Sequence, residues 1–94
     1  MEAKNLVNER IVLSQHAFAE LVIWSVQNPL LGSNHGYKYR LALIIDNECV
    51  MRYDNEVGKG DHKHVGSIET SFTFTSLEDL LTAFWADVEE LYHD

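Results

Sequence analysis

Apolar and polar residues alternate along much of the chain before residue 76, and this period of two is typical of β-strands. The clearest example is the segment Tyr37–Asp46, in which the odd-numbered residues are aromatic or aliphatic and the even-numbered ones include Lys38 and Arg40. Residues 46–48 (Asp-Asn-Glu) are typical of a tight turn, which predicts a hairpin to a returning strand at 49–54. Further strands or extended segments are expected at 9–15, 18–27, 61–66 and 68–74.

The period of the apolar residues changes to that of an α-helix after Ser76. Ser76 is a favourable N-cap, and Asp79 stands three residues later, close to the capping-box pattern. We therefore expect a helix from Ser76 to about Tyr92, whose apolar stripe packs on the sheet. Its buried residues should be Leu80, Leu81, Phe84 and Val88. The predicted fold class is α+β, an antiparallel sheet of about five strands with one long C-terminal helix packed on one face.

The composition is that of a small folded domain. With 94 residues, 46% of them apolar and 11% aromatic, the chain is expected to form a single domain over residues 1–94. The single cysteine, Cys49, excludes an intramolecular disulfide and a Cys-based zinc site, and we expect it to be a small buried residue in a strand. The sequence shows no signal segment and no apolar run long enough to cross a bilayer, so the expected location is the cytoplasm.

The formal net charge of −8 is unevenly distributed. Residues 76–94 contain six acidic side chains and no Lys or Arg, whereas residues 37–66 contain five basic and five acidic ones. This balance disfavours broad nonspecific binding of nucleic acid but allows a local basic face to contact phosphates. The acidic C-terminal segment predicts an exposed helix face that suits a basic partner.

Ionisable side chains are concentrated at residues 53–65, where Gly58 and Gly60 flank Lys59 and where His62 and His64 stand two residues apart. On a strand, that spacing places both imidazoles on one face. Three interpretations remain open: a solvated loop, an anion or phosphate site, and a metal site formed by the two histidines with a carboxylate. The candidate carboxylates are Asp54, Asp61 and Glu69. The segment is not a P-loop, because no Ser or Thr follows the lysine and no helix is expected after the glycines.

The same segment also carries a resemblance to a known family. The chain contains, in order, KYRL at 38–41, YDNE at 53–56, GKGDH at 58–62, His64, Glu69, FT at 74–75, Leu80, Phe84 and DVE at 87–89. In this order and spacing it resembles the TumE family of toxins over roughly residues 10–90. The resemblance implies the toxin of a type II toxin–antitoxin system, encoded beside a helix-turn-helix antitoxin that binds it and represses the shared operon.

These observations together predict a toxin that acts on RNA or a nucleotide. The candidate catalytic residues are Lys59, Asp61, His62 and His64, and the candidate substrate-binding residues are Lys38, Arg40 and Asp54. In this hypothesis the basic side chains hold phosphate and a histidine transfers protons, so that no metal and no cofactor are required.

Two alternatives remain open. One is a non-catalytic binding module that occupies a protein or ribosomal surface, and the other is a metal-dependent hydrolase built on His62 and His64. The expected partners are the helix-turn-helix antitoxin and RNA or a nucleotide, but no membrane, and the sequence leaves a homodimer open. The enzyme hypotheses require the side chains of residues 53–69 to converge beside Lys38 or Arg40, whereas a binding module does not.

Overall fold

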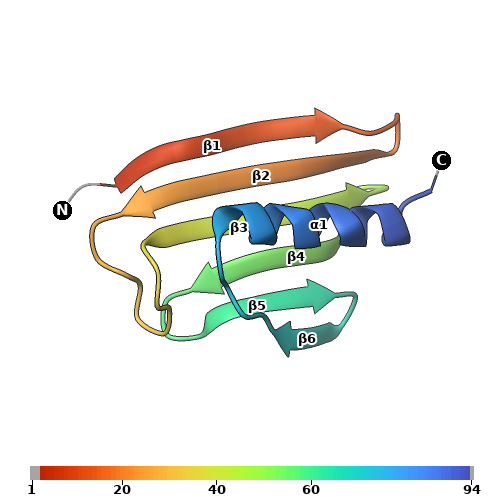
Figure 1. The fold of residues 1–94 in the computed structure, drawn as a ribbon. Helices are drawn as coiled ribbons and strands as arrows, with labels where there is room; N and C mark the ends of the chain where they lie inside the picture. The colour runs from red at the N-terminus through yellow and green to blue at the C-terminus, as the bar shows by residue number, and fades with distance from the viewer. Residues whose placement is uncertain (1–2, 94) are drawn as a thin grey trace.

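Six strands and one helix account for most of residues 3–93, which the computed structural model describes (Figure 1). The elements are β1 (Ala3–Val12), β2 (Ala17–Val26), β3 (Tyr37–Ile45), β4 (Glu48–Glu56), β5 (Gly60–Val65), β6 (Ile68–Ser71) and α1 (Leu77–Leu91). The strands form one antiparallel sheet in the order β1-β2-β3-β4-β5-β6, so each pairs with its neighbours in sequence. The predicted α+β class is confirmed. The sheet has six strands rather than about five, because both extended segments after residue 60 pair as strands.

The hairpin between β3 and β4 forms as its sequence predicts. Asp46 and Asn47 both have positive φ angles, of 50° and 67°. Two consecutive residues in the left-handed region are typical of a type I′ turn, and Asp and Asn tolerate this conformation better than most residues. This turn keeps β3 and β4 adjacent, and both strands contribute to the candidate site.

Two details of the strands differ from the sequence prediction. The first strand begins at Ala3 rather than at residue 9, because its N-terminal half lies exposed at the edge of the sheet and lacks the apolar alternation of a half-buried strand. Cys49 lies in β4 as expected, but it is exposed rather than buried. It is the second residue of β4 and pairs with Ile44, which shares with Arg40 the face of the sheet that α1 does not cover.

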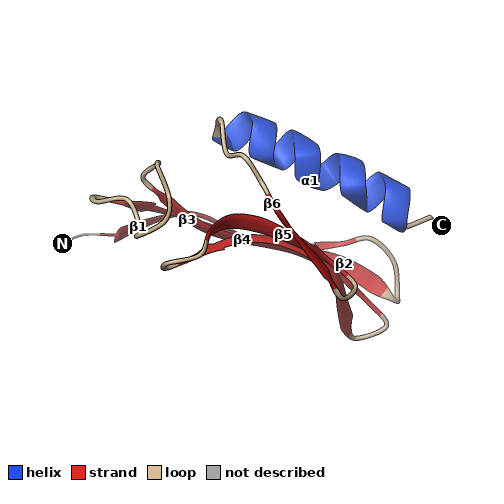
Figure 2. Ribbon diagram, turned by 90° about the horizontal axis from the view of Figure 1, so that it is seen from below, coloured by secondary structure: helices blue, strands red, loops and turns tan. Residues whose placement is uncertain are grey.

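The helix α1 lies across one face of the sheet, and no other element of residues 3–93 covers the opposite face (Figure 2). Ser76 caps the helix as predicted, because its Oγ accepts a hydrogen bond from the backbone N–H of Asp79 at 3.0 Å. The observed bounds agree with the predicted range of Ser76 to about Tyr92. Within residues 3–93, no helix is long and apolar enough to span a bilayer.

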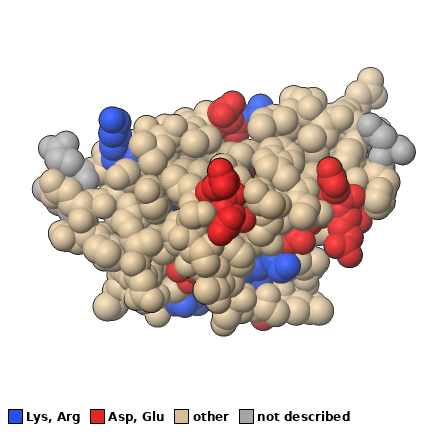
Figure 3. Space-filling model, in the orientation of Figure 1, with Lys and Arg blue, Asp and Glu red and all other residues tan. Residues whose placement is uncertain are grey.

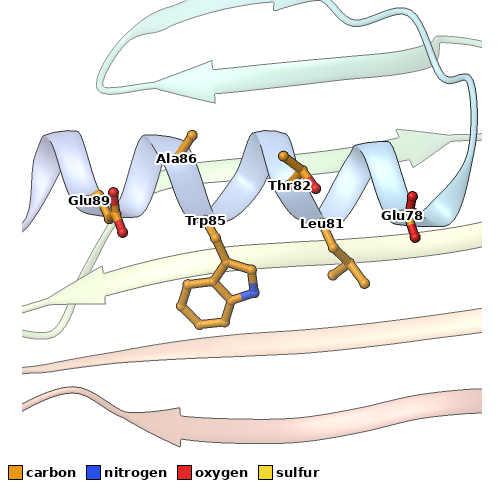
Figure 4. Close-up of a pocket in the computed structure, with 6 residues that line it drawn as sticks. All are labelled: Glu78, Leu81, Thr82, Trp85, Ala86 and Glu89. Atoms are coloured by element: carbon orange, nitrogen blue, oxygen red, sulfur yellow. The ribbon is translucent and has the colours of Figure 1, made fainter.

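The core lies between α1 and the three central strands. From the helix, Leu80, Phe84 and Val88 are buried as predicted. The sheet contributes alternate residues of β2, β3 and β4: Ala19, Leu21, Ile23, Tyr39, Leu41, Leu43, Met51 and Tyr53. Leu81 is an exception to the prediction, since it is only half-buried on the flank of α1, where it points toward the side of β2 and β1 (Figure 4).

This difference between two helix positions predicts two different stability losses. Phe84→Ala should lower the free energy of unfolding by about 3–5 kcal/mol, because it removes a fully buried ring and leaves a cavity. Leu81→Ala should cost clearly less, because its side chain is already partly in water. Urea denaturation of the two variants measures both values. Equal losses would contradict the difference in burial between Phe84 and Leu81.

Candidate functional site

Most of the predicted site residues project from the face of the sheet that α1 leaves uncovered, here called the open face. In the strand register, Asp54 of β4 pairs with Arg40 on one side and with His62 on the other. In the neighbouring row, Arg52 pairs with His64, and His64 pairs with Glu69 of β6. Directly paired residues point to the same side of a sheet, so the two rows place these side chains next to one another.

Asp54, His62 and His64 form a compact group, here called the His–Asp cluster. The Nε2 atom of His62 lies 2.6 Å from Oδ1 of Asp54, and the ring centroids of the two histidines are 4.9 Å apart with their planes at 78°. His62 and Asp54 are only 4% and 6% exposed, although they lie on a face without a covering layer. The predicted common face of the two imidazoles is therefore confirmed, and an aspartate from the neighbouring strand joins them.

The protonation of His62 follows from its backbone contact. Its Nδ1 atom lies 3.0 Å from the carbonyl oxygen of Gly60. Because a carbonyl can only accept, Nδ1 must carry a proton, and in the neutral imidazole Nε2 is then left with a lone pair. Glu69 approaches from the solvent side, with its Oε2 at 3.5 Å from Nε2 of His62 and 3.6 Å from Nε2 of His64.

Basic side chains border the cluster. Arg52 donates from Nε to Oδ2 of Asp54 at 2.7 Å. Arg40 is about half exposed and makes only a long contact of 3.6 Å, from Nη1 to Oε1 of Glu20. A depression of about 250 Å³ lies between these residues, lined by the side chains or backbone of Lys38, Tyr39, Arg40, Arg52, Asp54, Asn55 and Glu56. A second depression of about 180 Å³ shares Lys38 and Arg40 with the first and extends it to Trp24.

The open face differs in charge from the rest of the protein. By register and alternation, among residues 3–93 it carries four basic side chains (Arg10, Lys38, Arg40 and Arg52) and four acidic ones (Glu20, Asp54, Glu56 and Glu69). The fixed charges of this face therefore cancel, and the whole excess of −8 in the sequence belongs to other parts of the chain. The view of the helix-bearing side accordingly shows acidic groups over α1 (Figure 3).

Lys59 and Asp61 do not join the His–Asp cluster. Lys59 lies exposed in the turn between β4 and β5. Asp61 pairs with Asn55 and projects to the opposite face, where its Oδ2 accepts from Tyr39 Oη at 2.7 Å and contacts His35 Nε2 at 2.8 Å. Burial of the ring, the hydrogen bond to Asp61 and the negative charge of that carboxylate all raise the pKa of the Tyr39 hydroxyl. This arrangement ties the connection between β2 and β3 to the end of the sheet.

The glycines beside Lys59 serve close packing. Gly58 and Gly60 have φ angles of 86° and 76°, in the left-handed region that glycine adopts readily, and the chain bends sharply there. The backbone N–H of Gly58 donates to the carbonyl of Leu31 at 2.6 Å, and a Cβ atom on Gly60 would lie 2.7 Å from the carbonyl oxygen of Gly32. In this structure the bend therefore meets another segment of the chain.

Sequence reasoning missed Arg52 and Trp24 as members of the candidate site. Arg52 stands two residues before Asp54 in a predicted strand, so alternation alone would have placed both on one face. Trp24 could not be found in this way, because its position beside Lys38 depends on the pairing of β2 with β3.

The contact between the two glycine-containing segments can be tested by a matched pair of variants. Gly60→Ala should lower the free energy of unfolding by roughly 1–3 kcal/mol more than Gly58→Ala. Both positions have positive φ, but only the Cβ at residue 60 meets backbone, and the space at residue 58 is open. The two denaturation midpoints should differ accordingly. Equal midpoints would mean that Gly32 and Gly60 are not packed together.

Comparison with known proteins gives one match. The family model described as Toxin TumE matches residues 2–92 of the chain. No curated protein and no solved structure matches it.

Proposed function

The chain belongs to the TumE toxin family, and from this premise we propose that it is the toxin of a toxin–antitoxin module and cleaves RNA on the open face of its sheet. The observation that supports this most directly is the convergence of the His–Asp cluster beside Arg40 and Arg52. A group that can move protons or hold a cation there adjoins groups that can hold phosphate.

Phosphate binding is the role proposed for the basic side chains. Arg40 and Lys38 line both depressions, and Arg40 has no close ion-pair partner among the described residues. A guanidinium presents paired N–H donors that match phosphate oxygens, and a lysine adds a mobile positive charge. Trp24 lines the second depression, is 37% exposed, and offers a ring on which a base can stack. An RNA strand is the ligand that needs both kinds of contact.

The charge distribution supports the same face. RNA approaching the helix side would meet acidic groups, whereas the open face has no net fixed charge. The net charge of −8 therefore repels RNA from the molecule at long range, but this repulsion is much weaker at the open face. Lys59 and Asp61 line neither of the two depressions on the open face, and the polar contacts of Asp61 suit a structural role.

The RNA proposal predicts a contrast between two arginines of the same face. Arg40→Ala should reduce RNA cleavage by the purified protein about tenfold to a hundredfold, because it removes a charge-assisted phosphate contact. Arg10→Ala is the matched control, since Arg10 lies three strands away from the cluster and packs over the ring of Phe18. It should leave both cleavage and growth inhibition unchanged.

His64→Ala extends the test to the cluster itself. Its side chain is only 25% exposed, but the imidazole makes no hydrogen bond through Nε2, so the fold should survive and toxicity should be lost. Growth after induction and circular dichroism of the purified variant measure the two effects. Full toxicity of both Arg40→Ala and His64→Ala would exclude the open face, and would favour a binding module acting through another surface.

A toxin implies an antitoxin, and we propose the flank of α1 that faces β2 and β1 as the place where a small basic antitoxin binds. A hollow of about 470 Å³ on this surface is lined by Leu81, Trp85 and neighbouring residues, with Glu78 and Glu89 at its rim (Figure 4). An apolar centre with an acidic rim suits a partner that brings an apolar side chain surrounded by basic ones. The proposed partner is a helix-turn-helix protein encoded by the adjacent gene.

Co-purification with the product of the adjacent gene tests this surface. Glu89→Lys should weaken the complex about tenfold or more, and should make it less sensitive to salt, because it reverses a charge at the rim. Glu48→Lys, at the first residue of β4, is the control that changes the net charge equally and should leave affinity nearly unchanged. Equal weakening by both variants would point to long-range charge instead of a contact on α1.

A further inference from the structure

We propose that Asp54, His62 and His64 form a binding site for one divalent transition-metal ion, of the class of Zn²⁺. The inference deepens the proposed function, because it names what the same cluster holds, and it rests on that function only for the use of the ion in RNA cleavage. Metal binding itself stands on the geometry of the three side chains.

The three ligand atoms are close enough to share an ion. One ligand atom from each of Asp54, His62 and His64 lies within 4.8 Å of the ligand atoms of the other two. Zinc binds imidazole nitrogen and carboxylate oxygen at about 2.0–2.2 Å, so two ligands of one ion lie roughly 3 Å apart. The present separation of 2.6 Å between His62 Nε2 and Asp54 Oδ1 needs only a small widening.

Oδ1 of Asp54 and the Nε2 atoms of both histidines lack hydrogen-bond partners. They are buried, and none of them makes a hydrogen bond in the described part of the chain. His62 Nε2 and Asp54 Oδ1 lie 2.6 Å apart in an ion-pair contact, but neither atom makes a hydrogen bond. Polar atoms this well buried are nearly always satisfied, so a missing partner is an observation that requires a cause.

The protonation pattern indicates that the missing partner is a cation. His62 donates its Nδ1 proton to the carbonyl of Gly60, which leaves a lone pair on Nε2. Asp54 accepts from Arg52 through Oδ2, and its Oδ1 makes no hydrogen bond. Metal-binding histidines usually donate their second N–H to a carbonyl or carboxylate, and metal-binding carboxylates are themselves hydrogen-bonded. Both supporting contacts are present before any ion is added.

The ligand types decide the class of metal. Two imidazoles and one carboxylate suit Zn²⁺ and related first-row ions, whereas Mg²⁺ prefers oxygen ligands in an octahedral arrangement. Glu69 lies within reach of the remaining coordination position, and its side chain is 44% exposed, so it can move aside for a ligand from solvent. A bound ion would also add positive charge to a face whose fixed charges cancel, which would favour phosphate there.

Calorimetry on the untagged protein tests the site directly. Metal-stripped protein should bind one equivalent of Zn²⁺ with a Kd at or below the micromolar range, and Mg²⁺ at the same concentrations should produce no comparable heat. The measurements are made in the Cys49→Ser background, because the exposed thiol of Cys49 is itself a zinc ligand. Zn²⁺ should also raise the Tm of this protein by several degrees, since an ion that binds only the folded state stabilises it.

Variants locate the ion. His64→Ala should weaken Zn²⁺ binding by about a hundredfold or more, because it removes a direct ligand. Loss of a contact that only supports a ligand already lowers metal affinity by about 10–100-fold. His16→Ala is the matched control, because His16 is exposed and lies beside a single carboxylate, Asp46, at 3.6 Å. It should leave the Kd unchanged. If His64→Ala does not fold, the protein with His64 intact is loaded with Co²⁺ and its visible spectrum is measured instead. A spectrum without the features of histidine coordination would overturn the proposal.

Binding and cleavage fail separately. Absence of Zn²⁺ binding, or binding that persists in His64→Ala, would overturn the metal site. RNA cleavage that continues in metal-stripped protein would leave the proposed function intact and would also overturn the use of the ion there. Tight binding of Zn²⁺ without RNA cleavage would support the site and would contradict the proposed function instead.

Discussion

The position of β4 between β3 and β5 is the constraint on which the candidate site depends. Asp54 meets Arg40 on one side and His62 on the other only in the observed register. A slip of one residue would turn either partner to the opposite face, and the cluster would disappear. The register is held by the buried apolar residues of the helix-covered face, because the same slip would expose Leu41, Leu43 and Tyr53 to water. The core and the candidate site are therefore two consequences of one pairing.

Two buried carboxylates near each other in sequence illustrate how much the face matters. Asp54 and Asp61 lie on adjacent strands, but they project to opposite sides of the sheet. Asp61 accepts hydrogen bonds from the hydroxyls of Tyr39 and Ser33 and contacts His35, so both of its oxygens have partners within the structure. Asp54 keeps one oxygen without a hydrogen-bond partner. A carboxylate with an unused oxygen can bind a ligand, and a satisfied one cannot do so without breaking existing contacts.

The two sides of the molecule differ in charge and shape. The helix side carries acidic groups around an apolar hollow, and the open face carries a balanced set of charges around the His–Asp cluster. On the helix-covered side, the hydroxyl of Tyr53 donates to Asp87 at 2.6 Å, and Lys63 contacts the same oxygen of Asp87 at 3.0 Å. Burial, this hydrogen bond and the charge of Asp87 raise the pKa of Tyr53. These contacts connect α1 to β4 and β5, the strands that hold the cluster.

The sequence by itself determined the elements whose signals are local. The helix and its Ser76 cap, the Asp46–Asn47 turn and the common face of His62 and His64 were all predicted from short segments. Such features depend on the conformational preference and side-chain direction of neighbouring residues, which a sequence contains directly.

Tertiary structure decided which of these features meet. Lys59 and Asp61 stand in the same ionisable segment as the two histidines, but one lies in a turn and the other faces the opposite side. Trp24 lies beside Lys38 on the open face, while Leu81 and Cys49 are less buried than their patterns predicted. Each of these outcomes depends on which strand lies next to which and on the area that α1 covers. Those are set by burial of apolar surface between segments far apart in the chain, and a local pattern carries no information about them.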